Sequence, residues 1–128
     1  MNKRKVEELI PKAYKFLKEV GIANDDDEIS ETFVGYLSSY GASIQTGSLI
    51  GTICYFEKNE GKEKEACRIN RAIEKLIDKD ELRKYVMDGK NISTKKEEIT
   101  NALISLKLAA NLYKKIEDKE KNDGKHRE

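Results

Sequence analysis

Apolar residues recur at helical spacing near both ends of the chain. At about 100° per residue, those of residues 3–20 form a stripe about 120° wide, and Gly21 supplies a stop signal. The stripe consists of Val6, Leu9, Ile10, Ala13, Phe16, Leu17 and Val20. A second periodic segment follows the capping box of Thr94 and Glu97 and extends to about residue 116. Its apolar residues cover more than half of the helix circumference, which predicts a central helix with several neighbours.

The middle of the chain contains a long run without charge, from Thr32 to Phe56. We expect helices over residues 29–40 and 48–58, joined by a turn over residues 41–47, where glycine and small polar residues gather. The same glycine, serine and threonine residues make the run too polar for a membrane span. Because the rest of the chain is heavily charged, this run is expected to be the structural centre.

Two further helices are predicted between these segments. Residues 63–79 are amphipathic, and a short helix is expected over residues 80–87. No strand pattern competes with this interpretation. The sequence therefore predicts an all-α fold, a compact bundle of about five to six helices, in a single domain that spans residues 1–128. Residues 117–128 mix both charges without apolar periodicity and are expected to be a frayed tail.

Charged residues make up 38% of the 128 residues, and 25 Lys and Arg nearly cancel 24 Asp and Glu. Attraction for nucleic acid must therefore come from local patterning. Lysines interrupt the apolar segments too often for a signal sequence or a membrane span, so we expect a cytoplasmic protein. Cys54 and Cys67 are interpreted as packing residues, and with His126 as the single histidine we expect no zinc site and no cofactor.

The sequence shows no arrangement typical of catalysis. A Walker-type phosphate loop is absent, and the glycines Gly47 and Gly51 are better explained by helix packing. The uncharged segment contains no histidine, lysine or carboxylate that burial could turn into a nucleophile or base. We expect a protein that is not an enzyme.

Basic residues form a row on one predicted helix. At helical spacing they lie within about 80° of one another, opposite the apolar stripe. A sparser line of lysines follows the polar edge of the last helix and includes Lys96. The candidate RNA-binding residues from these two lines are Lys64, Arg68, Arg71, Lys75, Lys79, Lys107 and Lys114. Solvation of ordinary helix faces explains the same pattern without a ligand, and patterning alone favours that interpretation.

Residues 36–56 carry a motif: an aromatic helix, a turn with Ile44, then a helix with Leu49 followed by residues 52–55, Thr-Ile-Cys-Tyr. This motif resembles the centre of the small subunit of type III-B CRISPR effector complexes, the Cmr family, in which the second helix opens with Gly-Leu and continues Thr-Leu-small-Phe. Gly41 and Ser48 stand where the family more often has Pro and Gly, and no tryptophan follows in the late basic element.

The resemblance implies a non-catalytic subunit that stacks head to tail in a ribonucleoprotein used in antiviral defence. It would contact guide and target RNA, neighbouring copies of itself, and the backbone and large subunits, while cleavage belongs to the backbone subunit. Two alternatives stay open. One is a helical adaptor that binds only protein, through tyrosines and apolar residues near residues 41–47. The other is the small subunit of a type III-A or type I CRISPR complex.

Overall fold

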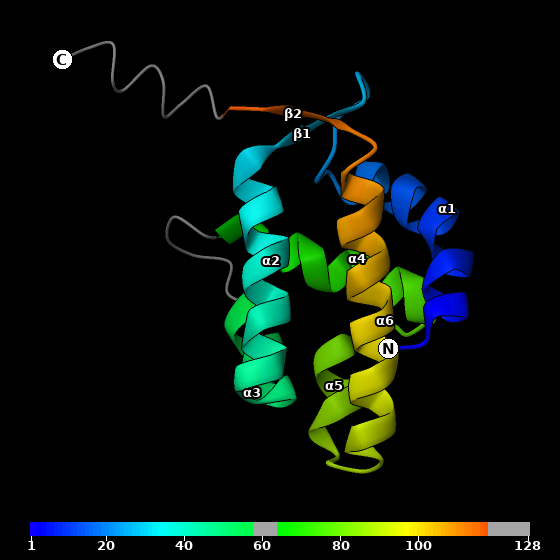
Figure 1. The fold of residues 1–128 in the computed structure, drawn as a ribbon. Helices are drawn as coiled ribbons and strands as arrows, with labels where there is room; N and C mark the ends of the chain where they lie inside the picture. The colour runs from blue at the N-terminus through cyan, green and yellow to red at the C-terminus, as the bar shows by residue number, and fades with distance from the viewer. Residues whose placement is uncertain (58–63, 118–128) are drawn as a thin grey trace, which may run out of the picture.

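The computed structural model describes residues 1–57 and 64–117, with the side chain of Lys64 outside this description. Helices dominate the described residues, which confirms the predicted all-α bundle (Figure 1). The α-helices are α1 (Lys3–Glu19), α2 (Glu31–Thr46), α3 (Leu49–Phe56), α4 (Cys67–Ile77), α5 (Leu82–Met87) and α6 (Ile92–Ala110). A short 3-10 helix, η1 (Lys64–Ala66), precedes α4. The structure also contains two short strands that the sequence analysis did not predict, β1 (Glu28–Ser30) and β2 (Lys114–Ile116). Of the predicted tail over residues 117–128, residues 118–128 lie outside the described residues.

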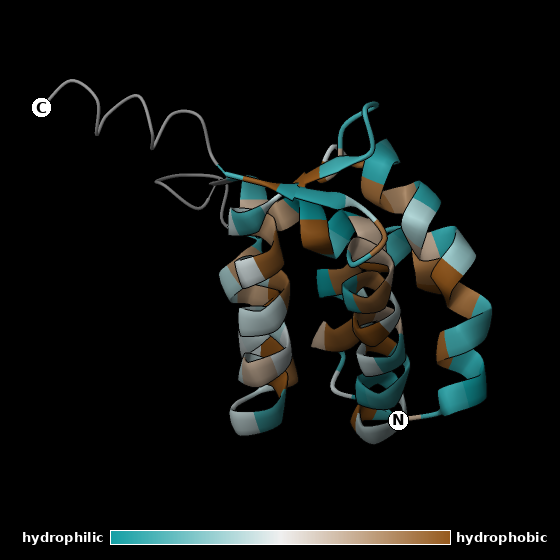
Figure 2. Ribbon diagram, turned by 45° about the horizontal axis from the view of Figure 1, so that its top comes forward, coloured by the Kyte–Doolittle hydropathy of each residue, from teal (hydrophilic) through white to brown (hydrophobic). Residues whose placement is uncertain are grey.

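Helix α6 is the centre of the bundle, as its wide apolar face predicts. It lies between α1 and α2 and also contacts α4 (Figure 1). Ile99 and Leu106 are completely buried, and Leu103 nearly so. Figure 2 shows hydrophobic residues on the inner sides of the helices and hydrophilic residues outside. Burial of apolar surface around α6 is therefore the main stabilising contribution that the described residues show.

Helix α1 begins and ends within one residue of its predicted bounds. The Asn2 side chain caps its first turn by accepting a hydrogen bond from the Lys5 N–H at 3.1 Å. Gly21 ends the helical segment with a φ of 83°, a left-handed conformation that favours glycine. The predicted apolar stripe is confirmed, since its members Val6, Leu9, Ala13 and Leu17 are buried.

The predicted turn over residues 41–47 is wrong, because α2 continues through Gly41 to Thr46. Tyr40 and Ile44 are buried on either side of Gly41, so packing against the bundle maintains the helix through a residue of low helix propensity. The chain turns only at Gly47 and Ser48, whose hydroxyl accepts a hydrogen bond from the Gly51 N–H at 3.0 Å and caps α3.

Helix α4 is shorter than the predicted helix over residues 63–79. It ends at Ile77 because Asp78 adopts a left-handed conformation, with φ 58° and ψ 52°. The carboxylate of Glu74 accepts a hydrogen bond from the Leu82 N–H at 2.8 Å, which holds the following turn and the start of α5 against α4. Lys79 therefore lies beyond the helix, and its predicted helical position is wrong.

Helix α6 ends at Ala110, so the predicted extension to about residue 116 is also wrong. Tyr113 turns back toward α1, where its ring stacks on Tyr14 at 4.3 Å and its hydroxyl donates a hydrogen bond to the Tyr14 carbonyl. The chain then forms β2, which pairs in parallel with β1 in the register of Glu28 with Lys114. This pairing joins two segments that are 86 residues apart in the sequence.

Candidate nucleic-acid interface

Arg68 is directed toward the end of α1 rather than along an open row on α4. Its guanidinium Nη1 donates a hydrogen bond to the carbonyl oxygen of Gly21 at 2.8 Å. Its Nη2 lies 3.7 Å from a carboxylate oxygen of Glu65. Arg68 therefore has a structural role, because it satisfies a carbonyl group that follows α1 and joins α4 to that segment.

Arg71 takes part in a polar network among the helices. Its guanidinium forms ion pairs with Glu57, which follows α3, and with Glu74 one turn along α4. Glu57 also accepts a hydrogen bond from the Asn70 side chain at 3.0 Å, and Asn70 accepts one from the Tyr40 hydroxyl at 2.7 Å. Two carboxylates therefore neutralise Arg71, and the charge that sequence analysis assigned to RNA helps to hold α2, α3 and α4 together.

Burial shifts the pKa of two groups in this network. The Tyr40 hydroxyl is buried, which raises its pKa well above the usual value. The Glu74 carboxyl also has a raised pKa because burial disfavours its charged form, although the Leu82 N–H and Arg71 oppose this effect. The network is a packing feature of the bundle, and α4 offers no continuous charge along this side.

Lys75 and Lys79 are exposed and follow different neighbours. The Lys75 ammonium lies 5.6 Å from the centre of the Phe16 ring on α1, whereas the Lys79 ammonium lies 4.9 Å from the centre of the Tyr85 ring on α5. The predicted continuous row of outward cations is therefore wrong, although contact of individual residues with RNA stays a prediction. Lys64 begins η1, and its side chain lies outside the described residues.

Lys107 lies in a different setting, at a groove between α2 and α6. The groove has a volume of about 390 Å³ and is lined by Ser38, Gly41, Ala42, Ile44, Gln45, Thr100, Leu103, Ile104 and Lys107. None of these lining residues carries a carboxylate, and Lys107 is the charged one among them. In the part of the chain that the structure describes, no carboxylate forms an ion pair with Lys107. The lining residues come from α2 and α6, which lie side by side in the bundle (Figure 1).

The groove presents groups that suit a phosphodiester backbone. Lys107 supplies a positive charge, Ser38 and Thr100 supply hydroxyl groups, and Gln45 supplies an amide. Groups of these kinds contact phosphate oxygens and ribose hydroxyls in nucleic-acid complexes, and such backbone contacts carry no sequence information. Lys96 lies on the same side of α6 at helical spacing. The groove therefore offers one positive charge and several neutral hydrogen-bonding groups of the kinds that contact nucleic-acid backbones.

Lys114 does not continue this line on α6. It belongs to β2, where it is exposed and opposite Glu28 in the strand register. No ion pair joins Lys114 to any residue that the structure describes. The structure thus separates the two predicted site residues that follow α4 in the sequence: Lys107 lies at the groove, and Lys114 lies at the end of the bundle where α6 leads into the strands.

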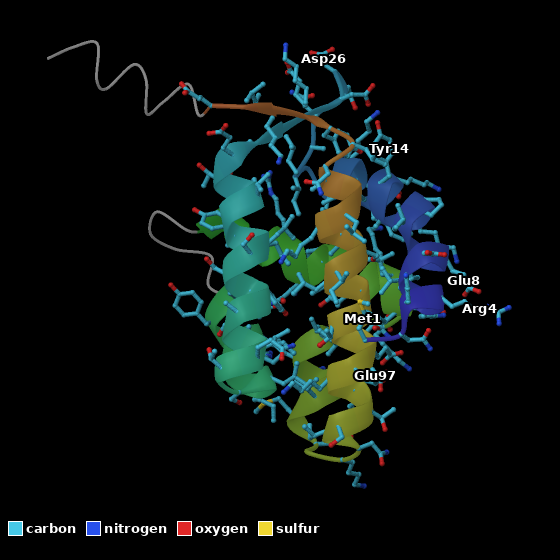
Figure 3. All side chains as sticks on the ribbon, in the orientation of Figure 1. Met1, Arg4, Glu8, Tyr14, Asp26 and Glu97 are labelled. Carbon is cyan, nitrogen blue, oxygen red and sulfur yellow. The ribbon has the colours of Figure 1, made fainter. Side chains whose placement is uncertain are left out.

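Several cations outside the predicted site are neutralised locally. Arg4 pairs with Glu8 at 3.7 Å, and both project from the outer side of α1 (Figure 3). Lys18 pairs with Asp27, and Lys84 pairs with Glu81 at 3.0 Å. These surface pairs contribute little to stability, but they reduce the free positive charge on their faces.

Lys95 is a buried cation that the sequence did not single out. Its ammonium donates hydrogen bonds to the Asp88 carboxylate at 2.9 Å and to the Tyr85 carbonyl at 2.7 Å. The bond from Lys95 lowers the pKa of Asp88, and the bond to Glu98 raises the pKa of Tyr85 to about 12. This cluster joins α5 to α6, so it explains a buried lysine without a ligand.

The remaining chemistry of the described residues adds no second site. Cys54 is exposed, so the interpretation of both cysteines as buried packing residues is wrong for Cys54, and Cys67 is half-buried. Within residues 1–57 and 64–117, no group of three or more histidine, cysteine or acidic residues is arranged to hold a metal ion. None of the described helices is both long enough and apolar enough to cross a membrane.

Comparisons with protein-family models, with curated proteins and with solved structures found no significant match to this chain. The resemblance to the Cmr small subunits therefore depends on the motif over residues 36–56. The groove itself was not predicted, because the sequence placed a turn where α2 continues. The uncharged run from Thr32 to Phe56 could have indicated the groove, because a helix without carboxylates offers no ion-pair partner to a lysine on a neighbouring helix.

Proposed function

We propose that this protein is a non-catalytic, RNA-binding structural small subunit of a type III-B CRISPR effector complex. In this role it would stack along the groove where guide and target RNA pair, as part of antiviral defence. The observation that carries the proposal is the carboxylate-free groove between α2 and α6, with Lys107 at its edge. The segment that resembles the Cmr family, residues 36–56, forms most of α2 and all of α3, and α2 is one wall of that groove.

The physical argument concerns charge and shape rather than sequence reading. A lysine flanked by hydroxyl and amide groups binds backbone phosphates of any sequence, which suits a subunit that must accept many guides. A single domain with net charge +1 has no strong overall attraction for nucleic acid, so affinity must come from such a local surface or from its repetition in an assembly. Repetition is what a stacked small subunit would provide.

One detail of the motif differs from the family pattern. Ile44, which corresponds to the turn position of the family motif, is buried inside α2. The two helices still join through a short turn, and the Ser43 and Thr52 hydroxyls are hydrogen-bonded at 2.7 Å. The motif therefore acts through packing here, which agrees with a structural role for its residues.

RNA affinity across a salt series tests the proposal. For single-stranded RNA, each lost phosphate contact reduces the slope of log affinity against log salt by about 0.7. We expect Lys107→Gln to reduce the slope by this amount at each copy of the binding site. Lys84→Gln is the matched control, since Lys84 is exposed but paired with Glu81, and its slope should equal that of the wild type. An unchanged slope for Lys107→Gln would contradict the assignment of the groove.

Two alternatives are separated by other measurements. The adaptor interpretation used tyrosines and apolar residues near residues 41–47; Tyr40 and Ile44 are buried, whereas Tyr55 is 47% exposed. Native assemblies without nucleic acid would favour an adaptor. A type III-A or type I small subunit would bind RNA in the same way, and mass spectrometry of the subunits that co-purify distinguishes these complexes from type III-B.

A further inference from the structure

Two large apolar side chains are exposed where α6 ends. Leu108 in the last turn of α6 is 43% exposed, and Leu112 in the connection to β2 is 65% exposed. They are four residues apart in the sequence. A single exposed leucine is ordinary on a protein surface. Here a tight turn separates two of them, with the Asn111 N–H bonded to the Leu108 carbonyl and the Leu112 N–H bonded to the Ala109 carbonyl.

The backbone around the two leucines is held in place. Tyr113, directly after Leu112, is buried, with its ring stacked on Tyr14 and its hydroxyl bonded to the Tyr14 carbonyl. The Lys114 N–H donates a hydrogen bond to the Asp27 carbonyl at 2.9 Å, which fixes the start of β2. Leu112 therefore lies between a helix end and a strand that are both anchored. A surface on such a frame loses little conformational entropy when it binds.

Lysines are the charged residues of the chain around the leucines as far as Ile116, which Glu117 follows. No acidic residue occurs from Ile99 to Ile116, whereas Lys107, Lys114 and Lys115 are all exposed. None of these three lysines forms an ion pair with a residue of the described part of the chain.

Acidic groups of the neighbouring elements offset this charge only in part. Glu28 faces Lys114 in the strand register, and Asp27 is already bonded to Lys18 and Tyr14. Asp26 projects from the loop before β1 (Figure 3). A second copy that used the same surface would bring lysine against lysine, so charge complementarity favours a different and acidic partner.

We propose that Leu108 and Leu112, together with Lys114 and Lys115, form a docking surface for an acidic amphipathic helix of another protein. The leucines would receive the apolar face of that helix, and the lysines would pair with its flanking carboxylates. The proposed docking is a second function, separate from RNA binding at the groove, and it does not depend on RNA binding. It predicts attachment of the subunit to a protein neighbour through the end of α6.

A designed peptide tests this docking surface. The probe is a fluorescently labelled helix-forming peptide with leucine at positions i, i+3, i+4 and i+7 and glutamate on its other faces, followed by fluorescence anisotropy. We expect saturable binding that weakens as salt increases. The double variant Leu108→Gln with Leu112→Gln should bind at least about tenfold more weakly, because the apolar contact area is lost. Lys114→Gln with Lys115→Gln should flatten the salt dependence.

Matched controls separate docking from general effects. Met87→Gln removes an exposed apolar side chain on α5, which is 57% exposed, and should leave peptide affinity unchanged. Thermal unfolding of each variant should resemble that of the wild type, since the leucines are exposed. Equal affinity of the Leu108→Gln/Leu112→Gln variant and the wild type, absence of saturable binding, or binding of anionic phosphatidylserine vesicles in place of the peptide would each overturn the proposal. RNA affinity of the same variant should stay unchanged, so failure here and failure of the RNA proposal are distinguishable.

Discussion

Lys107 of α6 lies over Gly41 of α2, with its ammonium nitrogen 3.8 Å from the position that a Cβ atom on Gly41 would occupy. The same Cβ position is 3.5 Å from Leu103, which is an ordinary van der Waals distance. The Lys107 amine therefore lies beside the α2 backbone at Gly41, where a Cβ atom would make only ordinary contacts. This relationship defines the groove on which the proposed function depends.

Replacement of Gly41 by alanine should stabilise the protein. A methyl group fits at both distances, and alanine is favoured over glycine inside a helix by about 0.5–1 kcal/mol. Gly35→Ala is the control, because nothing lies within 4 Å of a Cβ at Gly35 on the same helix. Urea unfolding should show a similar gain for both variants. A loss of stability for Gly41→Ala alone would mean that the α2 and α6 contact is tighter than described.

Arg71 should contribute to the stability of the fold through its ion pairs. Removal of its guanidinium leaves Glu57 and Glu74 without their cation, and we expect Arg71→Gln to lower the free energy of unfolding by about 1–3 kcal/mol. Removal of one partner from a fully buried ion pair costs more unfolding free energy than this, but the Arg71 side chain is 43% exposed, so solvent weakens its ion pairs. Lys75→Gln on the same helix should change stability by less than about 0.5 kcal/mol. Equal unfolding curves for the two variants would contradict a structural role for Arg71.

Glu74 should make the folded state less stable as the pH rises. Burial raises its pKa in the folded protein above the ordinary value of 4.5, so the folded state binds a proton more tightly than the unfolded state does. The stability linked to this proton is present below pH 4.5 and is lost as the pH rises through the raised pKa. Glu74→Gln cannot ionise, so its unfolding free energy relative to the wild type should increase between about pH 4 and pH 7. A constant difference over this range would show that Glu74 does not titrate with a raised pKa.

Asp88 should act in the opposite direction. The bond from Lys95 lowers its pKa below 3.8, so Asp88 stabilises the folded protein above that pH, and the contribution is lost as the pH falls through the lowered value. Denaturant unfolding of Asp88→Asn should therefore show reduced stability at pH 5 and a smaller deficit at pH 2. A deficit that is the same at both pH values would indicate a role for Asp88 that does not depend on its charge.

The helices were predictable where burial alone determines them. The stripes of α1 and the wide apolar face of α6 follow from the periodicity of residues such as Leu17 and Leu106, which no other arrangement could bury. The continuation of α2 through Gly41 was not predictable, since packing on α6 outweighs local propensity. The strands β1 and β2 were missed because three residues show no alternating pattern, and they pair across the sequence.

The candidate site was predictable only in part, because charge patterning along one helix shows cations but not their partners. Arg71 lies on the expected side of α4, yet Glu57 reaches it from the segment after α3, a contact that helical spacing cannot reveal. Lys107 was among the predicted residues, but its groove depends on the position of α2. Sequence patterning thus identified candidate cations, and their neutralisation was decided by tertiary contacts.

Nuclear magnetic resonance titration of the labelled protein with a short single-stranded RNA tests the central claim most directly. The proposed groove predicts chemical-shift changes concentrated at Ser38, Gly41, Gln45, Thr100 and Lys107, with little change at Arg71, where two carboxylates neutralise the guanidinium. Shifts confined to α4, or no shifts at an RNA concentration that saturates binding, would contradict the account.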